Sequence, residues 1–176
     1  MTPSDWTTTS PYVPDFGLVL GDRLNQFRLD PNHPAALLPG KRPRLTPNPG
    51  LVMKDGKPFM PIGTPGGDQQ PQAMIQVFLN VAEWNMNIQE AIEAPRFGSY
   101  NFPDSFAPHT YYPGRIAVEA PLEAKIGADL KNMGHEVVKW PAFTPLTGAI
   151  CAIIIENNGV LVGGADPRRE AYAIGW

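Results

Sequence analysis

The stretch LVMKDGKPFMPIGTPGGDQQPQAMIQVFLN, residues 51–80, decides the fold of this chain. Its first half holds two apolar runs on either side of Asp55-Gly56, and an Asp-Gly pair between such runs is the strongest short signal for a β-hairpin. We therefore expect a hairpin over residues 51–63. A hairpin followed directly by an amphipathic helix predicts a domain in which helices pack on a sheet.

The second half of this stretch predicts a helix that begins after Thr64-Pro65-Gly66-Gly67-Asp68 and ends near Trp84. Asp68 suits the N-cap position, and Pro71 still falls within the first turn, where a proline removes no helical hydrogen bond. The expected inward face is apolar and consists of Met74, Ile75, Phe78, Val81 and Ala82.

The flanking sequence predicts further elements on both sides. Two proline-rich stretches, residues 31–49 and 95–113, predict long ordered connections. A buried strand is expected over residues 17–21. The other expected elements are strands over residues 115–119, 135–139, 149–155 and 160–164 and helices over residues 87–94 and 122–133. The fold class is therefore α+β, with one layered domain over residues 1–176.

Composition narrows the class of protein. The chain has 176 residues, 43% of them hydrophobic and 18% charged, which fits a folded domain rather than a disordered tail. A net charge of −3 and the lack of a long basic run argue against a nucleic-acid partner. No apolar window of membrane-spanning length occurs, so no membrane partner is expected. The sequence shows no signal peptide and assigns no compartment.

Cysteine and histidine usage predicts neither a disulfide nor a metal site. Cys151 is the single cysteine, and its apolar surroundings favour a small buried residue over a reactive thiol. His33, His109 and His135 lack the spacing of metal ligands, so we expect them at the surface or in loop hydrogen bonds. No metal and no cofactor is expected.

The pair Gly66-Gly67 is the most informative local feature. Two consecutive glycines let the backbone approach a ligand closely, and their amides lie next to the positive end of the expected helix. Such amides can stabilise the negative charge that develops on an oxygen during acyl transfer. The alternative is a tight turn that needs glycine for its dihedral angles alone.

Several short motifs follow one another in a set order. They are Lys41-Arg42-Pro43, Asp55-Gly56, Pro65-Gly66-Gly67, Gln76 to Asn80, Met86 to Ala91, Ala94-Pro95-Arg96-Phe97 and Asp166-Pro167-Arg168-Arg169. In this order they resemble the small, carboxy-terminal subunit of gamma-glutamyltranspeptidases, also called glutathione hydrolases, from about Thr2 to Gly175. The resemblance implies a partial αββα sandwich of the N-terminal-nucleophile hydrolase type. The amino-terminal large subunit of the same precursor would complete it.

The resemblance also implies a chemistry. In this family a precursor cuts itself before a threonine, whose hydroxyl attacks a gamma-glutamyl carbonyl while its free amine serves as the base. Water or an acceptor amine then resolves the acyl-enzyme. The family places this nucleophile upstream of the position that Thr2 matches, so the chain alone is expected to be inactive. The alternative is a truncated subunit that only binds a ligand.

The expected site residues follow from the resemblance position by position. Gly66 and Gly67 match the oxyanion-hole pair, and Thr2 matches a threonine that hydrogen-bonds the hydroxyl of the nucleophile. Thr46 matches the second of two serines that contact the alpha-carboxylate of the substrate, and Ser4 stands in place of an asparagine.

At three positions the residue type differs from that of the family in the pocket that binds the glutamate part of the substrate. Leu45 replaces the first serine of the pair, and Arg23 and Gln26 stand where the family has a glutamine and an aspartate. That aspartate grips the alpha-amino group of the substrate, and a neutral Gln26 cannot supply such a charge-assisted bond. We therefore expect an amide substrate whose acyl part differs from plain gamma-glutamyl, or a pocket that holds the gamma-glutamyl group in a different way. The alternatives are an acylase with another specificity or a transferase acting on a poly-gamma-glutamate-like polymer.

The stretch Asp166-Pro167-Arg168-Arg169 follows the last expected strand. An aspartate before a proline favours a turn, and its carboxylate can orient a neighbouring arginine. We expect this stretch to form a structural latch.

Overall fold

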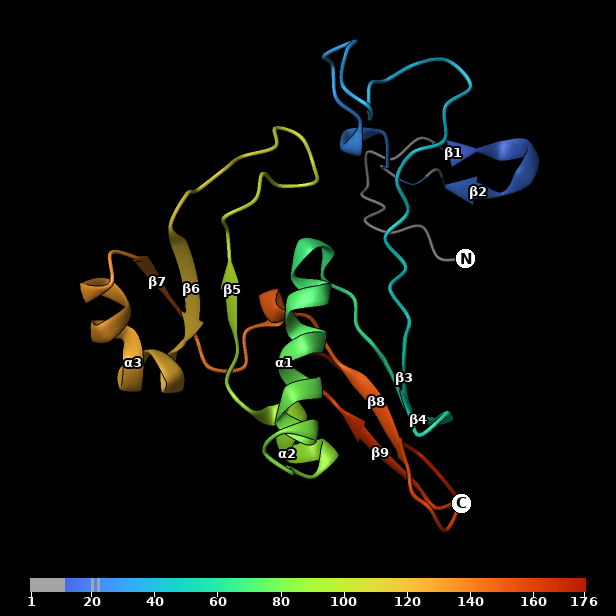
Figure 1. The fold of residues 1–176 in the computed structure, drawn as a ribbon. Coiled ribbons are helices and arrows are strands. Elements are labelled where there is room, and N and C mark those ends of the chain that lie inside the picture. The colour runs from blue at the N-terminus through green and yellow to red at the C-terminus, as the bar shows by residue number, and fades with distance from the viewer. Residues whose placement is uncertain (1–11, 20, 22) are drawn as a thin grey trace. The chain divides into compact units, whose positions relative to one another are not determined.

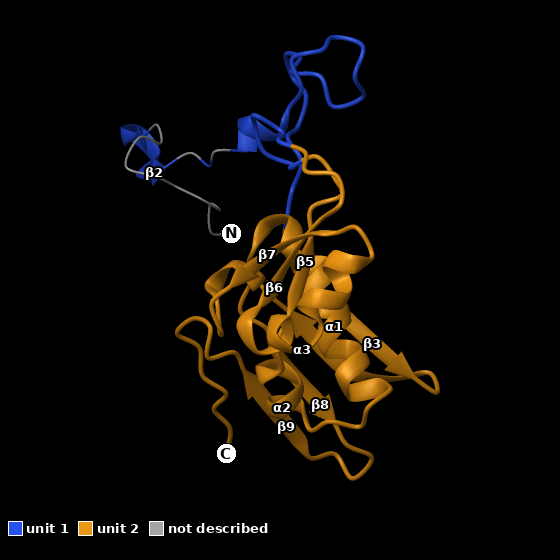
Figure 2. Cartoon of the chain, turned by 90° about the vertical axis from the view of Figure 1, so that its left-hand side faces the viewer, with its two compact units in different colours: residues 1–46, 104–110 blue, residues 47–103, 111–176 orange. Residues whose placement is uncertain are grey.

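The computed structural model describes residues 12–19, 21 and 23–176 of the chain. Two compact units are drawn in different colours in Figure 2: unit 1 comprises residues 1–46 and 104–110, and unit 2 comprises residues 47–103 and 111–176. The single domain expected from the sequence stays a prediction.

A four-stranded antiparallel sheet is the main sheet of unit 2. Its strands, in spatial order, are β3 (Gly50–Lys54), β4 (Lys57–Gly63), β8 (Cys151–Ile155) and β9 (Leu161–Ala165). β3 and β4 form the expected hairpin, and Asp55 and Gly56 have φ values of 50° and 75°. Two successive left-handed residues are what a type I′ turn needs, so the hairpin prediction is confirmed.

Two helices cover one face of this sheet (Figure 1). They are α1 (Gln70–Ala82), which follows a 3₁₀ turn at Gly67–Gln69, and α2 (Ile88–Glu93). The core between helices and sheet consists of Met60, Ile62, Ala73, Val77, Ile88, Ala91, Ile92, Ile150 and Ala152. Removal of these apolar side chains from water is the main force that holds the helices on the sheet.

Helix α1 differs from its prediction in its N-cap and in two residues of its inward face. Asp68 lies in the 3₁₀ turn and is exposed, and the N-cap position of α1 is Gln69, so Asp68 does not cap this helix. Ile75 is 50% exposed and Ala82 is also exposed, although both were expected inside, while Val77 is fully buried. Ile75 lies about 100° further round the helix than Met74, which carries it off the inward stripe.

Helix α2 confirms its prediction. The side chain of Asn87 caps the helix by accepting the N–H of Glu90 at 2.9 Å. Ile88, Ala91 and Ile92 are all buried, as the spacing of apolar residues predicts.

The face of the main sheet that points away from α1 and α2 is here called the outer face. Side chains alternate along a strand, so the neighbours of core residues point to this side. Its exposed side chains are Leu51, Met53, Cys151, Ile153 and Leu161. The prediction that Cys151 is buried is wrong, because β8 turns Ala152 toward the helices and Cys151 away from them.

A three-stranded sheet is the second sheet of unit 2. It consists of β5 (Phe97–Ser99), β6 (Arg115–Glu119) and β7 (Glu136–Trp140). β6 and β7 are parallel, and α3 (Ala120–Asn132) makes the crossover that parallel strands require. Gly134 follows α3 with a φ of 92°, which confirms its expected place at the end of that helix.

The sequence does not predict β5, which lies in the second proline-rich stretch. β5 pairs with β6 on one side, and two glutamine side chains of α1 bond its backbone. The amide group of Gln76 bonds the N–H and the carbonyl of Phe97 at 3.0 and 2.9 Å, and Gln72 does the same for Ser99 at 2.7 and 3.2 Å. A strand this short depends on partners that are distant in sequence.

Unit 1 has little regular structure. It contains β1 (Tyr12–Val13), β2 (Leu18–Val19) and 3₁₀ turns at Pro14–Phe16 and Arg23–Gln26. The buried strand expected over residues 17–21 is wrong, because β2 has two residues and Leu18 is 59% exposed. A two-stranded ribbon offers no second layer against which to bury it. Residues 27–49 hold neither a helix nor a strand, which confirms the long connection.

Among the described helices, none combines the length and the apolar character that a membrane span requires.

Candidate active site

The segment between β4 and α1, residues 64–67, is here called the Pro-Gly-Gly loop. Gly66 has a φ of 133° and Gly67 a φ of 56°. A residue with a side chain is strained at both angles, so the loop needs glycine at both positions. The carbonyl of Gly66 accepts the N–H of Gln69 at 3.1 Å and thereby starts the 3₁₀ turn.

The amide N–H of Gly66 has no hydrogen-bond partner among the described residues, and Gly66 is half-buried. It stands at the beginning of the helical segment that runs from Gly67 to Ala82. The dipole of such a segment favours an anion at this end. An N–H in this environment can therefore bind a developing oxyanion.

A second part of the chain lies against the loop at Gly148, which is buried and has a φ of 88°. The two glycines are in contact, since a Cβ on Gly66 would lie 3.2 Å from the Cα of Gly148. Thr64 Oγ1 joins the two segments. It accepts the N–H of Ala149 at 2.7 Å and donates to the carbonyl of Pro65 at 2.7 Å.

Unit 2 also holds a buried network of four charged residues: Arg96, Glu119, Asp166 and Arg168. Asp166 pairs with Arg96 at 2.7 Å and with Arg168 at 3.2 Å, and Glu119 pairs with Arg168 at 2.6 Å. Two positive and two negative charges balance, which lets them stay buried. Burial lowers the pKa of Arg96 despite the opposing charge of Asp166. Burial also opposes the charge of Arg168, but its hydrogen bond with Glu119 and the charge of Asp166 outweigh this and raise its pKa.

This network holds the segment that contains Gly148. Arg96 Nη1 donates to the carbonyl of Thr147 at 3.3 Å, and the N–H of Ile150 donates to Asp166 Oδ2 at 2.9 Å. The expected latch is confirmed, because Asp166 Oδ1 accepts the N–H of Arg168 at 3.0 Å. The sequence does not reveal the part played by Arg96, since no local signal pairs it with an aspartate so far along the chain.

Four of the expected substrate-binding residues belong to unit 1. Gln26 is 4% exposed, and its Oε1 accepts a hydrogen bond from Arg23 Nη1 at 3.5 Å. Gln26 Nε2 is buried and has no partner among the described residues. Leu45 is 64% exposed and Thr46 is half-buried.

Two expected site residues, Thr2 and Ser4, lie outside the described residues. Gly66 and Gly67 belong to unit 2. That all these residues share one site stays a prediction.

The three histidines bond backbone groups, as expected: His33 accepts the N–H of Ala35, and the rings of His109 and His135 each contact a backbone carbonyl. The described residues include no group of three His, Cys, Asp or Glu side chains that could hold a metal ion.

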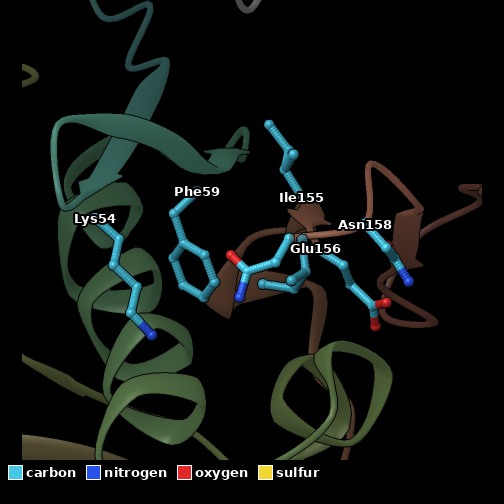
Figure 3. A pocket seen from close by; sticks show the side chains of 7 residues that line it. Lys54, Phe59, Ile155, Glu156 and Asn158 are labelled. Atoms are coloured by element: carbon cyan, nitrogen blue, oxygen red, sulfur yellow. The ribbon is translucent and has the colours of Figure 1, made fainter.

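An open hollow of about 380 Å³ lies at the other end of the main sheet (Figure 3). It is lined by Lys54, Phe59, Ile154, Ile155, Glu156, Asn157 and Asn158, around the tips of two hairpins. From this end, β4 carries the chain about 20 Å to Gly63, at the usual rise of a strand. The hollow is therefore separate from the Pro-Gly-Gly loop.

Solved structures share this arrangement of helices and sheets. The gamma-glutamyltranspeptidase from Pseudomonas nitroreducens, solved in complex with L-DON, superposes with a TM-score of 0.77 at 25% identity, over 100% of this chain and 91% of that chain. The fold is accordingly α+β, part of the αββα sandwich of N-terminal-nucleophile hydrolases.

Sequence comparison narrows this class. A family model described as Gamma-glutamyltranspeptidase matches residues 6–176. The glutathione hydrolase-like YwrD proenzyme of Bacillus subtilis is 36% identical over 92% of this chain and 30% of that protein. The oxamate amidohydrolase proenzyme of Klebsiella pneumoniae is 34% identical over 93% of this chain and 30% of that protein. The chain belongs to the gamma-glutamyltranspeptidase family, whose members are hydrolases and transferases. It spans 30% of the length of these two relatives.

Proposed function

We propose that the protein to which this chain contributes cleaves gamma-glutamyl or related amide bonds through a threonyl acyl-enzyme. The observation that carries the proposal is the N–H of Gly66, which is unpaired among the described residues at the start of a helical segment. A donor that is already oriented needs no reorganisation when an oxyanion forms. In this proposal Gly66 and Gly67 form the oxyanion hole.

The proposed reaction has two steps. A threonine hydroxyl supplied by the same precursor adds to the amide carbonyl, the C–N bond breaks, and the amine leaves with a proton relayed by the amino group of that threonine. Water or an acceptor amine then attacks the resulting ester and releases the threonine. Negative charge gathers on the carbonyl oxygen in both steps, and one N–H donor there contributes roughly 2.7–4 kcal/mol.

We further propose that the amino-terminal large subunit of the precursor covers the outer face of the main sheet. Leu51 and Leu161 are 57% and 63% exposed there, and Met53 is 52% exposed. An apolar patch of this kind is typical of a protein interface. The relatives are proenzymes of which this chain spans 30%, so each has ample additional chain for such a partner. No nucleic-acid or membrane partner is proposed.

We propose that the pocket for the acyl part of the substrate differs from a pocket that binds the alpha-ammonium group of a gamma-glutamyl substrate. The Nε2 of Gln26 is a buried donor without a described partner, and Arg23 adds a positive charge beside it. Amide N–H and guanidinium groups bind acceptors, and an ammonium group offers only donors. A substrate with a carboxylate or carbonyl oxygen at this place suits both residues. Oxamate, for which the Klebsiella relative is named, has this chemistry.

The test is an assay of the complete precursor with gamma-glutamyl-p-nitroanilide and oxamate in parallel. We expect faster cleavage of the substrate that lacks an alpha-ammonium group. Gamma-glutamyl turnover comparable to that of ordinary family members would exclude the changed pocket and leave the hydrolase proposal intact. If a precursor with an intact nucleophile cleaves no amide, the hydrolase proposal fails in favour of an inactive, ligand-binding subunit.

A further inference from the structure

The hydroxyl of Thr64 bonds both segments that meet where Gly66 touches Gly148. It donates to the carbonyl of Pro65 at 2.7 Å and accepts the N–H of Ala149 at 2.7 Å. A hydroxyl has a single proton to donate, so these two bonds fix its orientation. Thr64 is thereby tied to a backbone segment far away along the chain.

The bond to the Pro65 carbonyl also sets the direction of the Gly66 N–H. The two groups belong to one planar trans peptide and point in opposite directions, so any rotation of the carbonyl turns the N–H by the same angle. Gly66 has no side chain to limit this rotation. A hydrogen bond must therefore supply the restraint that sterics do not.

Gly148 has no side chain, which leaves space for the hydroxyl of Thr64 and the carbonyl of Pro65. A Cβ on Gly148 would collide with Thr64 Oγ1 and lie 2.8 Å from the carbonyl oxygen of Pro65. The segment cannot easily withdraw, because Arg96 and Asp166 hold the residues on either side of it. A side chain at Gly148 would thus displace the hydroxyl and the carbonyl together.

We propose that Thr64 is a positioning residue of the oxyanion hole, which aims the N–H of Gly66 through the carbonyl of Pro65. The inference rests on the proposed function and adds to it a residue that does not touch the substrate. It predicts that loss of the hydroxyl weakens stabilisation of the transition state and leaves substrate binding in the ground state unchanged.

The test uses the complete precursor with Thr64→Val, which removes the hydroxyl and keeps the shape of the side chain. Loss of one oxyanion donor costs about 10²–10³-fold in kcat, so a misaimed donor should cost about 10- to 100-fold, with KM within about twofold. Thr64→Ser keeps the hydroxyl and should retain most of the activity. Thr144→Val is the matched control, because it removes a buried threonine hydroxyl that bonds Leu146 and not Pro65.

Each kcat is calculated per molecule of folded and processed enzyme. Circular dichroism measures the folded fraction, and gel electrophoresis measures the processed fraction. An unchanged kcat in Thr64→Val, or an equal loss in Thr64→Ser, would overturn the inference. Gly148→Ala is a second variant for which the same fall in kcat is expected. An unchanged kcat in Gly148→Ala would also overturn the inference.

A crystal structure of Thr64→Val supplies a readout that does not need activity. We expect the peptide between Pro65 and Gly66 to be rotated relative to the wild type, and an unrotated peptide overturns the inference. A wild-type protein that cleaves no amide counts instead against the proposed function, so the two failures can be told apart.

Discussion

The proposed role of Gly66 in the oxyanion hole depends on its backbone conformation. At a φ of 133° a side chain is strained, and its Cβ would lie 3.2 Å from the Cα of Gly148. We predict that Gly66→Ala lowers kcat of the complete enzyme by about 10²–10³-fold, the effect of losing one oxyanion donor. The control is Gly63→Ala, because a Cβ on Gly63 meets open space. Equal losses in steady-state assays of both variants would indicate general damage instead of a lost donor.

Gln26 is the residue at which specificity can be tested. We predict that Gln26→Asp raises kcat/KM for gamma-glutamyl-p-nitroanilide by about tenfold or more, because a hydrogen bond to a charged group contributes about 1.5–3 kcal/mol. Gln26→Asn has the same size as the aspartate variant and no charge, so it should bring no gain. If the asparagine variant gains as much, the size of the side chain and not its charge sets the preference.

Residues whose role follows from local backbone geometry could be predicted from the sequence, and others could not. Asn87 precedes apolar residues at helical spacing (Ile88, Ala91 and Ile92), so its position at the start of a helix is visible locally. Thr64 and Gly148 carry no such signal, because their roles arise only when two distant segments meet. The separation of two residues along the sequence does not predict that they will be in contact in the fold.

At the scale of the element, the cap of α2 can be tested because a helix of six residues makes few backbone hydrogen bonds of its own, and the cap adds one to them. We predict that Asn87→Ala lowers the free energy of unfolding of the complete protein by about 1 kcal/mol, measured by urea denaturation. Asn87→Ser should lose far less, since serine also accepts the N–H of Glu90. Similar losses in both variants would contradict the capping role.

The buried network gives a larger predicted effect. Asp166→Asn leaves Arg96 and Arg168 short of one negative charge, and breaking a buried ion pair in this way costs about 3–5 kcal/mol. The control is Lys139→Gln, which removes the exposed ion pair with Glu123 and should cost less than about 1 kcal/mol. Urea denaturation of both variants measures the difference, and a small loss in Asp166→Asn would show that the network contributes little.

Elements with a strong local pattern could be predicted, such as the hairpin around Asp55-Gly56 and helix α2. Two failures share one physical cause. β5 depends on its pairing with β6 and on side-chain amides of α1 that bond its backbone. The described residues of the run at 17–21 are exposed, because no layer covers them among the described residues of unit 1. In both cases the outcome depends on whether another part of the folded chain lies against the segment, and the local sequence does not show this.

For the whole molecule, the outer face determines how the isolated chain should behave. It exposes Leu51, Met53, Ile153 and Leu161 to water, which costs free energy and promotes association. We predict that the chain expressed alone is poorly soluble or molten, with far-UV dichroism but weak near-UV dichroism and binding of a hydrophobic dye. A monodisperse product with a sharp two-state melt would contradict this. Expression with the remainder of the precursor is the control and should restore a cooperative melt.

The contact between the two glycines also matters for directed evolution of the proposed acyl preference. Neither position has room for a methyl group, since one on Gly66 would lie 3.2 Å from the Cα of Gly148, and one on Gly148 would collide with Thr64 Oγ1 and the carbonyl of Pro65. A randomised library that includes either position would consist mostly of dead clones. Positions 23, 26, 45 and 46, which belong to the other unit, are better targets for randomisation.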